Sequence, residues 1–421
     1  MYPETTDLSP KKAIVDESDE DDDDDEDDLI KHDVHLGFLV KGRENMMFND
    51  GNWSLWDGGI VGGKPSWLDP VNIPSPNIMQ CQFCHDPMIF LLQIYCPLDD
   101  NPEAFHRSLY IFCCTKSSCF SKGAIKCYRC QLPRINHYYA ATATDPLPNI
   151  NRNSNLCALC GCSATNSCSK CKVTYYCSKL HQKLNWKDHK LDCDASINDK
   201  TIISPELPGT RSQVGLYPEY DIDVDSEELD DYTLDKIDKM VVEANIWDDA
   251  MMKEVDNEDA DKDLTQKDYN ESLGNTSKVD AVYDKFIDRI RRGGNDQVLR
   301  YCRWKKESRL YISSVEKRKT NCNFLCQICG APKEIEFQVL PQLLYFLNVD
   351  AKTKVPSNLE CAVAPPTAPP TKEEFFKNNK GEDIDFGTID IYTCTNSCSQ
   401  VACVYSSYIE ESVYIQSIVL E

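Results

Sequence analysis

Short apolar runs, each about the length of one strand, dominate the hydrophobic pattern of this chain. Residues 34–40 (VHLGFLV), 90–95 (FLLQIY) and 108–114 (SLYIFCC) are rich in β-branched and aromatic side chains. Runs of this length and composition predict buried strands rather than helices. We therefore expect a strand-rich protein.

One helix is predicted with a clear periodicity. Its apolar side chains recur at steps of three and four residues, at Val279, Val282, Phe286 and Ile290. This spacing places them on one face of an amphipathic helix. Ser277 is a suitable N-cap, with Asp280 three residues on, and Gly293 with Gly294 is expected to end the helix.

Acidic residues are concentrated outside these runs. The 421 residues carry a formal net charge of −24, and twelve of the thirteen residues from 16 to 28 are acidic. Such a segment cannot bury enough apolar surface to fold, so residues 1–32 are predicted to be a disordered tail. Residues 194–276 are also acidic and are predicted to be a flexible insert. The charge argues against direct nucleic-acid binding and suits a basic partner; a merely solvating tail without a partner is the alternative.

The 23 cysteines indicate metal sites rather than disulfides. No apolar stretch resembles a signal peptide or reaches the length of a membrane helix. Cys-x-x-Cys pairs in such a chain favour structural zinc, which takes four ligands.

A cysteine-dense block from 157 to 193 holds eight potential ligands in four pairs. They are Cys157 with Cys160, Cys168 with Cys171, Cys177 with His181, and His189 with Cys193. Eight ligands are the number for two tetrahedral zinc ions, and the last two pairs are spaced one helical turn apart. Zinc would stabilise a block that has few apolar residues. We treat the neighbouring Cys162 as a spare thiol.

A second pattern is an internal repeat. CQFCHDP at Cys81 recurs as CQICGAP at Cys326, and each copy leads into an apolar run that contains glutamine. Downstream, SLYIFCCTKSSC parallels TIDIYTCTNSC. The repeat predicts two related halves, each with one zinc held by four cysteines: Cys81, Cys84, Cys114 and Cys119 in the first, and Cys326, Cys329, Cys394 and Cys398 in the second.

Three points about these ligand sets stay open. Either outer set could have lost its metal. Cys113 is adjacent to Cys114 and could replace it as a ligand. Cys127 and Cys130 have knuckle spacing, but the second half has no matching cysteines, so we interpret this pair as coincidental.

The block at 157–193 resembles a MYND zinc finger, including the phrases Tyr-Tyr-Cys-Ser and Trp-x-x-His-Lys. The resemblance implies interleaved pairing, with Cys157, Cys160, Cys177 and His181 on one zinc and Cys168, Cys171, His189 and Cys193 on the other. It also implies a peptide-binding finger, often for Pro-rich segments, without catalysis.

The order of phrases along the whole chain resembles the programmed cell death protein 2 family. These phrases include GGKPSWL, FLLQIY, FHRSLYIFCC, QLPR, QVLRYCR and IYTCTNSC, with the MYND finger between QLPR and QVLRYCR. The resemblance implies a dedicated chaperone that binds a newly made small-subunit ribosomal protein in ribosome biogenesis. Cys127 and Cys130 and the long acidic insert depart from the family's pattern.

Together these observations predict an α+β fold: two strand-rich, zinc-clamped halves forming one body, with an inserted MYND finger and acidic disordered segments. The expected boundaries are 1–32, 33–148, 155–193, 194–276 and 277–421. The complete ligand sets leave no open coordination position for a catalytic water, and no nucleotide-binding or hydrolase motif is present. We therefore expect stoichiometric binding rather than an enzyme.

The competing hypothesis is an adaptor that recruits Pro-rich partners through the MYND finger in transcription or in the control of cell death and proliferation. For the chaperone, capture of a nascent protein favours the cytoplasm, with shuttling to the nucleus as an open alternative. No membrane association is expected.

Overall fold

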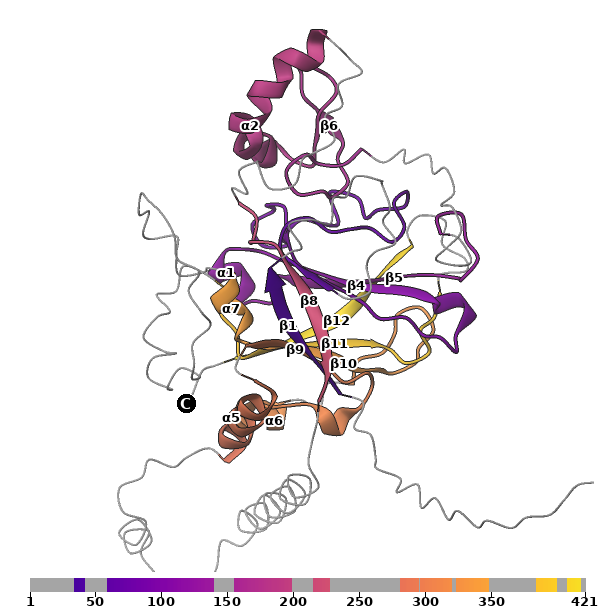
Figure 1. Cartoon of the computed structure of the whole chain (residues 1–421), viewed down its shortest axis with the longest axis vertical. Coiled ribbons are helices and arrows are strands. Elements are labelled where there is room, and N and C mark those ends of the chain that lie inside the picture. The colour runs from indigo at the N-terminus through magenta and orange to yellow at the C-terminus, as the bar shows by residue number, and fades with distance from the viewer. Residues whose placement is uncertain are drawn as a thin grey trace, which may run out of the picture. The chain divides into compact units, whose positions relative to one another are not determined.

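The computed structural model describes residues 34–41, 59–139, 155–198, 215–227, 281–294, 296–319, 323–347, 384–399 and 407–417. The predicted acidic tail and most of the predicted insert lie outside these residues. Ten strands close one barrel (Figure 1): β1 (His35–Lys41), β2 (Gly59–Val61), β3 (Ile89–Tyr95), β4 (His106–Cys113), β5 (Ile125–Leu132), β8 (Tyr220–Ser226), β9 (Gln297–Tyr301), β10 (Lys333–Val339), β11 (Thr388–Cys394) and β12 (Tyr408–Gln416). The predicted strand-rich character is confirmed.

The strand order around the barrel is β1-β8-β2-β3-β4-β5-β12-β11-β10-β9. Strands β2 to β5 and β9 to β12 each form a meander, and the two meanders meet at the antiparallel β5–β12 pair. At the opposite side β1 pairs with β9, while β8 pairs with β2. Strand β1 of the first half therefore pairs with β9 of the second, β8 lies between β1 and β2, and the strands of neither half close the barrel alone.

Matching irregularities occur in the two meanders. The register between β3 and β4 shifts between Phe90 and Leu92, and the register between β10 and β11 shifts between Ile335 and Phe337. In the alignment of the two knuckles these are equivalent positions. The predicted duplication stays a prediction, but the repeated order and the repeated bulge support it.

Strand β8 corrects the expectation for residues 194–276, because Tyr220–Ser226 is a barrel strand rather than flexible chain. Its sequence, YDIDVDS, alternates apolar residues with aspartate, which is the pattern of a half-buried strand. Ile222 is buried, whereas Asp223 and Asp225 are exposed. The surrounding acidic composition hid this short alternation.

The start of β8 packs against the Gly62-Gly63 turn that follows β2. Gly63 donates its N–H to Tyr217 O at 3.0 Å, and Gly62 has a φ of 67°. A Cβ at Gly62 would lie 2.0 Å from Pro218 O, which is closer than any side chain tolerates.

Replacing Gly62 by alanine should therefore destabilise the fold by about 3 kcal/mol or more, from backbone strain plus the clash. The matched control is Gly123→Ala. Gly123 has a φ of 85° but open space around it, so only the backbone term of about 1 kcal/mol applies. Chemical denaturation of both variants measures the difference, and equal losses would show that the contact with β8 is unimportant.

The packing of the core explains why the strand sequences are continuous apolar runs. In β4, Leu109 and Ile111 pack in a cluster that gathers side chains from both halves, including Phe337 and Ile391. The alternate residue Tyr110 packs in a second cluster together with residues of the cysteine-dense block. Both faces of this strand are therefore buried.

Buried ion pairs connect strands that are not neighbours in the sheet. Arg107 of β4 donates two hydrogen bonds to Glu336 of β10, at 2.5 and 2.7 Å, and both side chains have no exposed surface. Glu336 also accepts from Tyr301 at 2.7 Å and from Thr393 at 2.5 Å. Lys333 of β10 likewise pairs with Glu411 of β12. Other buried pairs are Arg129–Glu411, between the neighbouring strands β5 and β12, Arg300–Glu227 and Arg309–Asp390.

The helical elements lie outside the barrel strands: η1 (Pro102–Ala104), α1 (Ser117–Phe120), α2 (Lys179–Asn198), α5 (Ala281–Gly293), η2 (Lys306–Ser308), α6 (Ser314–Lys319) and α7 (Leu343–Phe346). The predicted amphipathic helix is confirmed as α5, with Phe286 and Ile290 buried and Gly294 at a φ of 97° after its end. Ser277 and Val279 lie outside the described residues. None of the helices in the described part of the chain is long and apolar enough to span a membrane.

Candidate metal centres

The four Cys-x-x-Cys knuckles fold into the same turn. In each knuckle the residue after the second cysteine donates its N–H to the carbonyl of the first at 2.9 Å. That residue has a left-handed backbone, with φ between 60° and 74°: His85, Gly161, Lys172 and Gly330. The turn brings the two cysteines of each pair to the same site. Glycine directly after the second cysteine, at Gly161 and Gly330, is a sequence signal for two of these turns.

Two of these left-handed positions carry side chains that disfavour the conformation. Replacing His85 by glycine should stabilise the folded protein by about 0.5–1 kcal/mol, because glycine adopts positive φ without strain. Gly330→Ala is the reverse control and should destabilise by a similar amount, since no atom lies within 4 Å of the added Cβ. Thermal unfolding of the two variants tests the pair, and shifts of the same sign would contradict the argument.

The first outer cluster joins the knuckle before β3 to the end of β4 and to α1. Cys81, Cys84, Cys114 and Cys119 have their sulfur atoms within 4.8 Å of one another, and the Cys84 and Cys114 sulfurs are 3.7 Å apart. Cys113 points elsewhere, with its sulfur 3.7 Å from Tyr217 OH in the cluster shared by both halves. Because successive side chains of a strand point to opposite faces, the two adjacent cysteines at the end of β4 point in different directions.

The second outer cluster has the same construction. The sulfurs of Cys326 and Cys398 are 3.5 Å apart, as are those of Cys329 and Cys394. All four lie within 4.8 Å of one another. The cluster joins the knuckle before β10 to the end of β11.

The cysteine-dense block forms two clusters around β6 (Asn166–Ser167), β7 (Tyr175–Tyr176) and α2. One contains Cys157, Cys160, Cys177 and His181, and the other contains Cys168, Cys171, His189 and Cys193. These are the two sets that the MYND resemblance implies. The helix supplies ligands to both clusters.

Both histidines have a ring nitrogen in reach of a metal. His181 Nδ1 lies 3.1 Å from the Cys177 sulfur, and His189 Nε2 lies 3.6 Å from the Cys171 sulfur. His189 Nδ1 lies 3.4 Å from the Thr174 hydroxyl. Such a partner on the second nitrogen is the usual way to fix the orientation of a ligating imidazole.

The spacing of the sulfur atoms fits a tetrahedral metal. A Zn–S bond of about 2.3 Å gives a tetrahedron whose edge is about 3.8 Å. The sulfur pairs at 3.5–4.0 Å agree with this edge. A disulfide would instead require about 2.05 Å. All four clusters are therefore compatible with zinc, and none of the cysteines in the described part of the chain is disulfide-bonded.

Backbone donors favour the thiolate at one cysteine in each of two clusters. Burial raises the pKa of Cys326, but the N–H groups of Cys329 and Ile328 outweigh it and hold the pKa at about 7. Burial also raises the pKa of Cys171, but the N–H groups of Thr174 and Val173 outweigh it and lower the pKa to about 7. Metal ligands must be deprotonated, so these turns prepare the sulfur for binding.

Cys127 and Cys130 do not share a site. Both are buried in β5, but Cys127 belongs to the cluster shared by the two halves and Cys130 to the cluster that includes the cysteine-dense block. Strand residues three apart point to opposite faces.

The double variant Cys127→Ala, Cys130→Ala should therefore keep the zinc content of the unaltered chain. Mass spectrometry of the native protein measures it, and the loss of one ion would contradict this geometry.

One contact that sequence patterns did not reveal connects the barrel to the cysteine-dense block. Trp67, in the GGKPSWL segment, is 4% exposed and donates its indole N–H to Gly161 O at 2.8 Å. Its ring stacks on Tyr110 and Phe112 and meets the edge of Tyr408. Trp67 is thus a core residue, and Phe90, which has no exposed surface, packs in the same cluster.

A strand-rich barrel with four cysteine and histidine clusters compatible with zinc, two of them in a MYND-type finger, defines the class of this protein. Three family models match the chain. They are Programmed cell death protein 2, N-terminal domain, over residues 33–146; Programmed cell death protein 2, C-terminal putative domain, over 280–417; and MYND finger, over 157–193.

Curated relatives agree with these matches. Programmed cell death protein 2 of Mus musculus is 32% identical over 374 residues, which cover 85% of this chain and 90% of the relative. Programmed cell death protein 2-like of Homo sapiens is 25% identical, over 82% of this chain and 86% of the relative. This chain belongs to the programmed cell death protein 2 family. Egl nine homolog 1 of Homo sapiens matches only 12% of the chain, at 42% identity. No solved structure gives a significant match.

Proposed function

We propose that this protein is a dedicated chaperone that binds one newly made, basic ribosomal protein of the small subunit and supports ribosome biogenesis. Binding is stoichiometric and without turnover. The observation that carries the proposal is the net charge of −24 on a protein of this family. Acidic surface attracts a basic client and screens it from stray RNA.

The chemistry of the clusters fits a binding role. Each cluster has four protein ligands, so a bound zinc would have no open position for a catalytic water. None of the three matching family models describes an enzyme. Zinc in all four clusters, two ions in the finger and one in each outer cluster, is part of this proposal. So are a cytoplasmic location, with shuttling to the nucleus as an alternative, and the absence of direct nucleic-acid or membrane binding.

The test is capture of the client shortly after its synthesis. The full chain should co-purify one small-subunit ribosomal protein from pulse-labelled extract, and deletion of residues 16–28 should weaken this capture. In the control, the twelve acidic residues of that segment are replaced by Asn or Gln. This variant keeps the length of the segment and removes its charge, so it shows which of the two matters for capture. If the full chain retains no ribosomal protein early after synthesis, the chaperone proposal fails.

A MYND-based adaptor is the second candidate. The finger match favours it, as do the exposed apolar side chains of Trp186 and Leu191 on α2, which are 42% and 80% exposed. These would suit a Pro-rich peptide. Cys168→Ala should abolish partner binding if the adaptor is correct and leave most client binding intact if the chaperone is correct.

A further inference from the structure

The four metal clusters differ in how well the protein covers their ligands. All eight ligands of the two finger clusters are buried, and in the first outer cluster only Cys84 is partly exposed. In the second outer cluster Cys398 is partly exposed and Cys329 is exposed. Among the cysteines that the structure describes, Cys329 is the only exposed one. Small solutes therefore reach the second outer cluster more readily than the other three.

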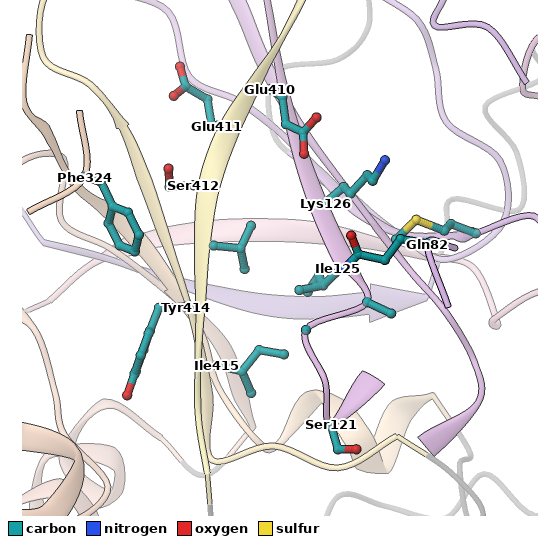
Figure 2. A pocket seen from close by; sticks show the side chains of 14 residues that line it. Gln82, Ser121, Ile125, Lys126, Phe324, Glu410, Glu411, Ser412, Tyr414 and Ile415 are labelled. Carbon is teal, nitrogen blue, oxygen red and sulfur yellow. The ribbon is translucent and has the colours of Figure 1, made fainter. Parts of the chain in front are cut away.

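The two outer clusters occupy equivalent places in the fold, so their positions do not explain this difference. Each joins a knuckle before one strand to the end of the next strand, and both lie beside the same pocket. Gln82 of the first knuckle lines this pocket, as does Phe324, two residues before the second knuckle. Figure 2 shows these two residues on opposite sides of β12. The difference in cover therefore comes from the residues around each cluster.

An ion pair covers part of the first outer cluster. Asp86 accepts a hydrogen bond from Lys116 Nζ at 2.6 Å, and the same carboxylate oxygen lies 3.7 Å from the Cys84 sulfur. When the two repeats are aligned on their cysteines, Ala331 and Asn396 stand at the positions of these two charged residues. The second outer cluster cannot form such a pair.

The segment that carries the last ligand is also better packed in the first outer cluster. Cys119 lies in α1, and the next residue, Phe120, is 1% exposed and packs in the cluster shared by the two halves. In the second half the stretch from Cys394 to Cys398 is one residue shorter and forms a turn in place of the helix. Cys398 is therefore covered less completely than Cys119.

We propose that Cys329 is a site of oxidation by small peroxides, and that this reaction empties the second outer cluster of its metal. The thiolate is the reactive form of cysteine, and metal ligands are thiolates. Susceptibility to oxidation follows thiolate character and exposure, and only Cys329 combines ligand position with full exposure in the described part of the chain. The inference rests on the zinc occupancy that belongs to the proposed function and is independent of the ribosomal client.

A second thiolate lies close enough to complete the reaction. The Cys394 sulfur is 3.5 Å from that of Cys329. The Cys329 thiolate attacks one peroxide oxygen, the O–O bond breaks, hydroxide leaves, and Cys329 becomes a sulfenic acid. The Cys394 thiolate then attacks the sulfenic sulfur, a disulfide forms and a second hydroxide leaves. Two thiolates have lost two electrons to the peroxide, and the remaining Cys326 and Cys398 no longer complete a four-ligand site.

The test is the order in which the zinc-loaded full chain loses its ions in hydrogen peroxide. Native mass spectrometry counts the ions over time, and peptide mapping identifies the disulfide. The first ion should leave about fivefold faster than the second, because the other clusters are better covered. The three-ion form should contain a Cys329–Cys394 disulfide. Dithiothreitol with added zinc should restore the fourth ion.

Two variants separate exposure from loss of a ligand. Cys329→His keeps a zinc-binding side chain but removes the thiol, so it should start with four ions and lose the first one about fivefold more slowly. Ala331→Asp with Asn396→Lys introduces the ion pair of the first outer cluster and should slow the first loss about twofold or more, through better cover. The matched control, Asp86→Ala with Lys116→Asn, removes that pair from the first outer cluster and should speed the second loss instead.

Three results would overturn the inference: loss of all ions at one rate, a first disulfide in another cluster, or no zinc in the second outer cluster before peroxide is added. Unchanged loss from both Cys329→His and the Ala331→Asp, Asn396→Lys variant would overturn it as well. Client capture by the reduced chain separates this inference from the chaperone function. If the ribosomal protein is captured but peroxide does not act at Cys329, only the oxidation site fails. If Cys329 is oxidised first but no ribosomal protein is captured, only the chaperone function fails.

Discussion

With one zinc ion in each of the four clusters, as proposed, replacing Cys114 by alanine should leave three ions on the chain instead of four. The sulfur of Cys114 lies 3.7 Å from that of Cys84 and completes the first outer cluster. Structural zinc stabilises small domains by about 10–16 kcal/mol, so removal of one ligand should cost several kcal/mol and release the end of β4. Native mass spectrometry and chemical denaturation measure the two effects.

The adjacent Cys113 is the matched control. Its sulfur points away from the cluster toward Tyr217, so Cys113→Ala should keep four ions and lose only about 1–2 kcal/mol of packing. Three ions in Cys113→Ala and four in Cys114→Ala would reverse the assignment. Retention of all four by both would mean that Cys114 does not bind the metal.

Glu336→Gln should be the most damaging substitution in the barrel away from the metal clusters. Burial raises the pKa of Glu336, but the charge and hydrogen bonds of Arg107 outweigh it and hold the pKa at about 2. The neutral amide would leave the buried Arg107 guanidinium without its counterion. Breaking a buried pair from one side costs about 3–5 kcal/mol.

Glu334 is the control on the same strand. It pairs at 2.8 Å with Lys306, whose side chain is 72% exposed, so Glu334→Gln should cost at most about 1 kcal/mol. The difference between the unaltered chain and Glu336→Gln should shrink as the pH falls from about 4.5 toward 2. A depressed carboxyl pKa contributes stability above the unfolded-state value and loses it as the carboxylate takes up a proton. Equal costs for the two substitutions would show that the pair across the barrel contributes little.

These two predictions concern different kinds of contact, one within a half and one between the halves. The metal clusters hold each knuckle to a strand end within its own half. The Arg107–Glu336 pair connects β4 of one half to β10 of the other, 229 residues away in the chain. Loss of a cluster should therefore act first at the strand ends that it joins, whereas loss of the ion pair should loosen the contact between the halves.

Local patterns in the sequence determined the metal clusters. Ligand type and spacing are local properties, so the Cys-x-x-Cys pairs and the turn-spaced pairs on α2 were recognisable one by one. The repeat at Cys81 and Cys326 then indicated which distant pairs belong together, and the structure brings together the same four sets of four. The amphipathic face of α5 followed from its periodicity for the same reason.

Only the tertiary structure decided how the halves combine. The place of β8 between β1 and β2, the pairing of β1 with β9 and the closure into one barrel depend on pairings between residues far apart in the chain, and short patterns carry no information on such partners. Likewise, Glu336 or Arg107 taken alone would be interpreted as a surface charge on a strand. Only the fold shows that the two form a buried pair. The sequence by itself therefore determined where metal can bind and that the chain forms strands. The fold alone decided what those strands enclose.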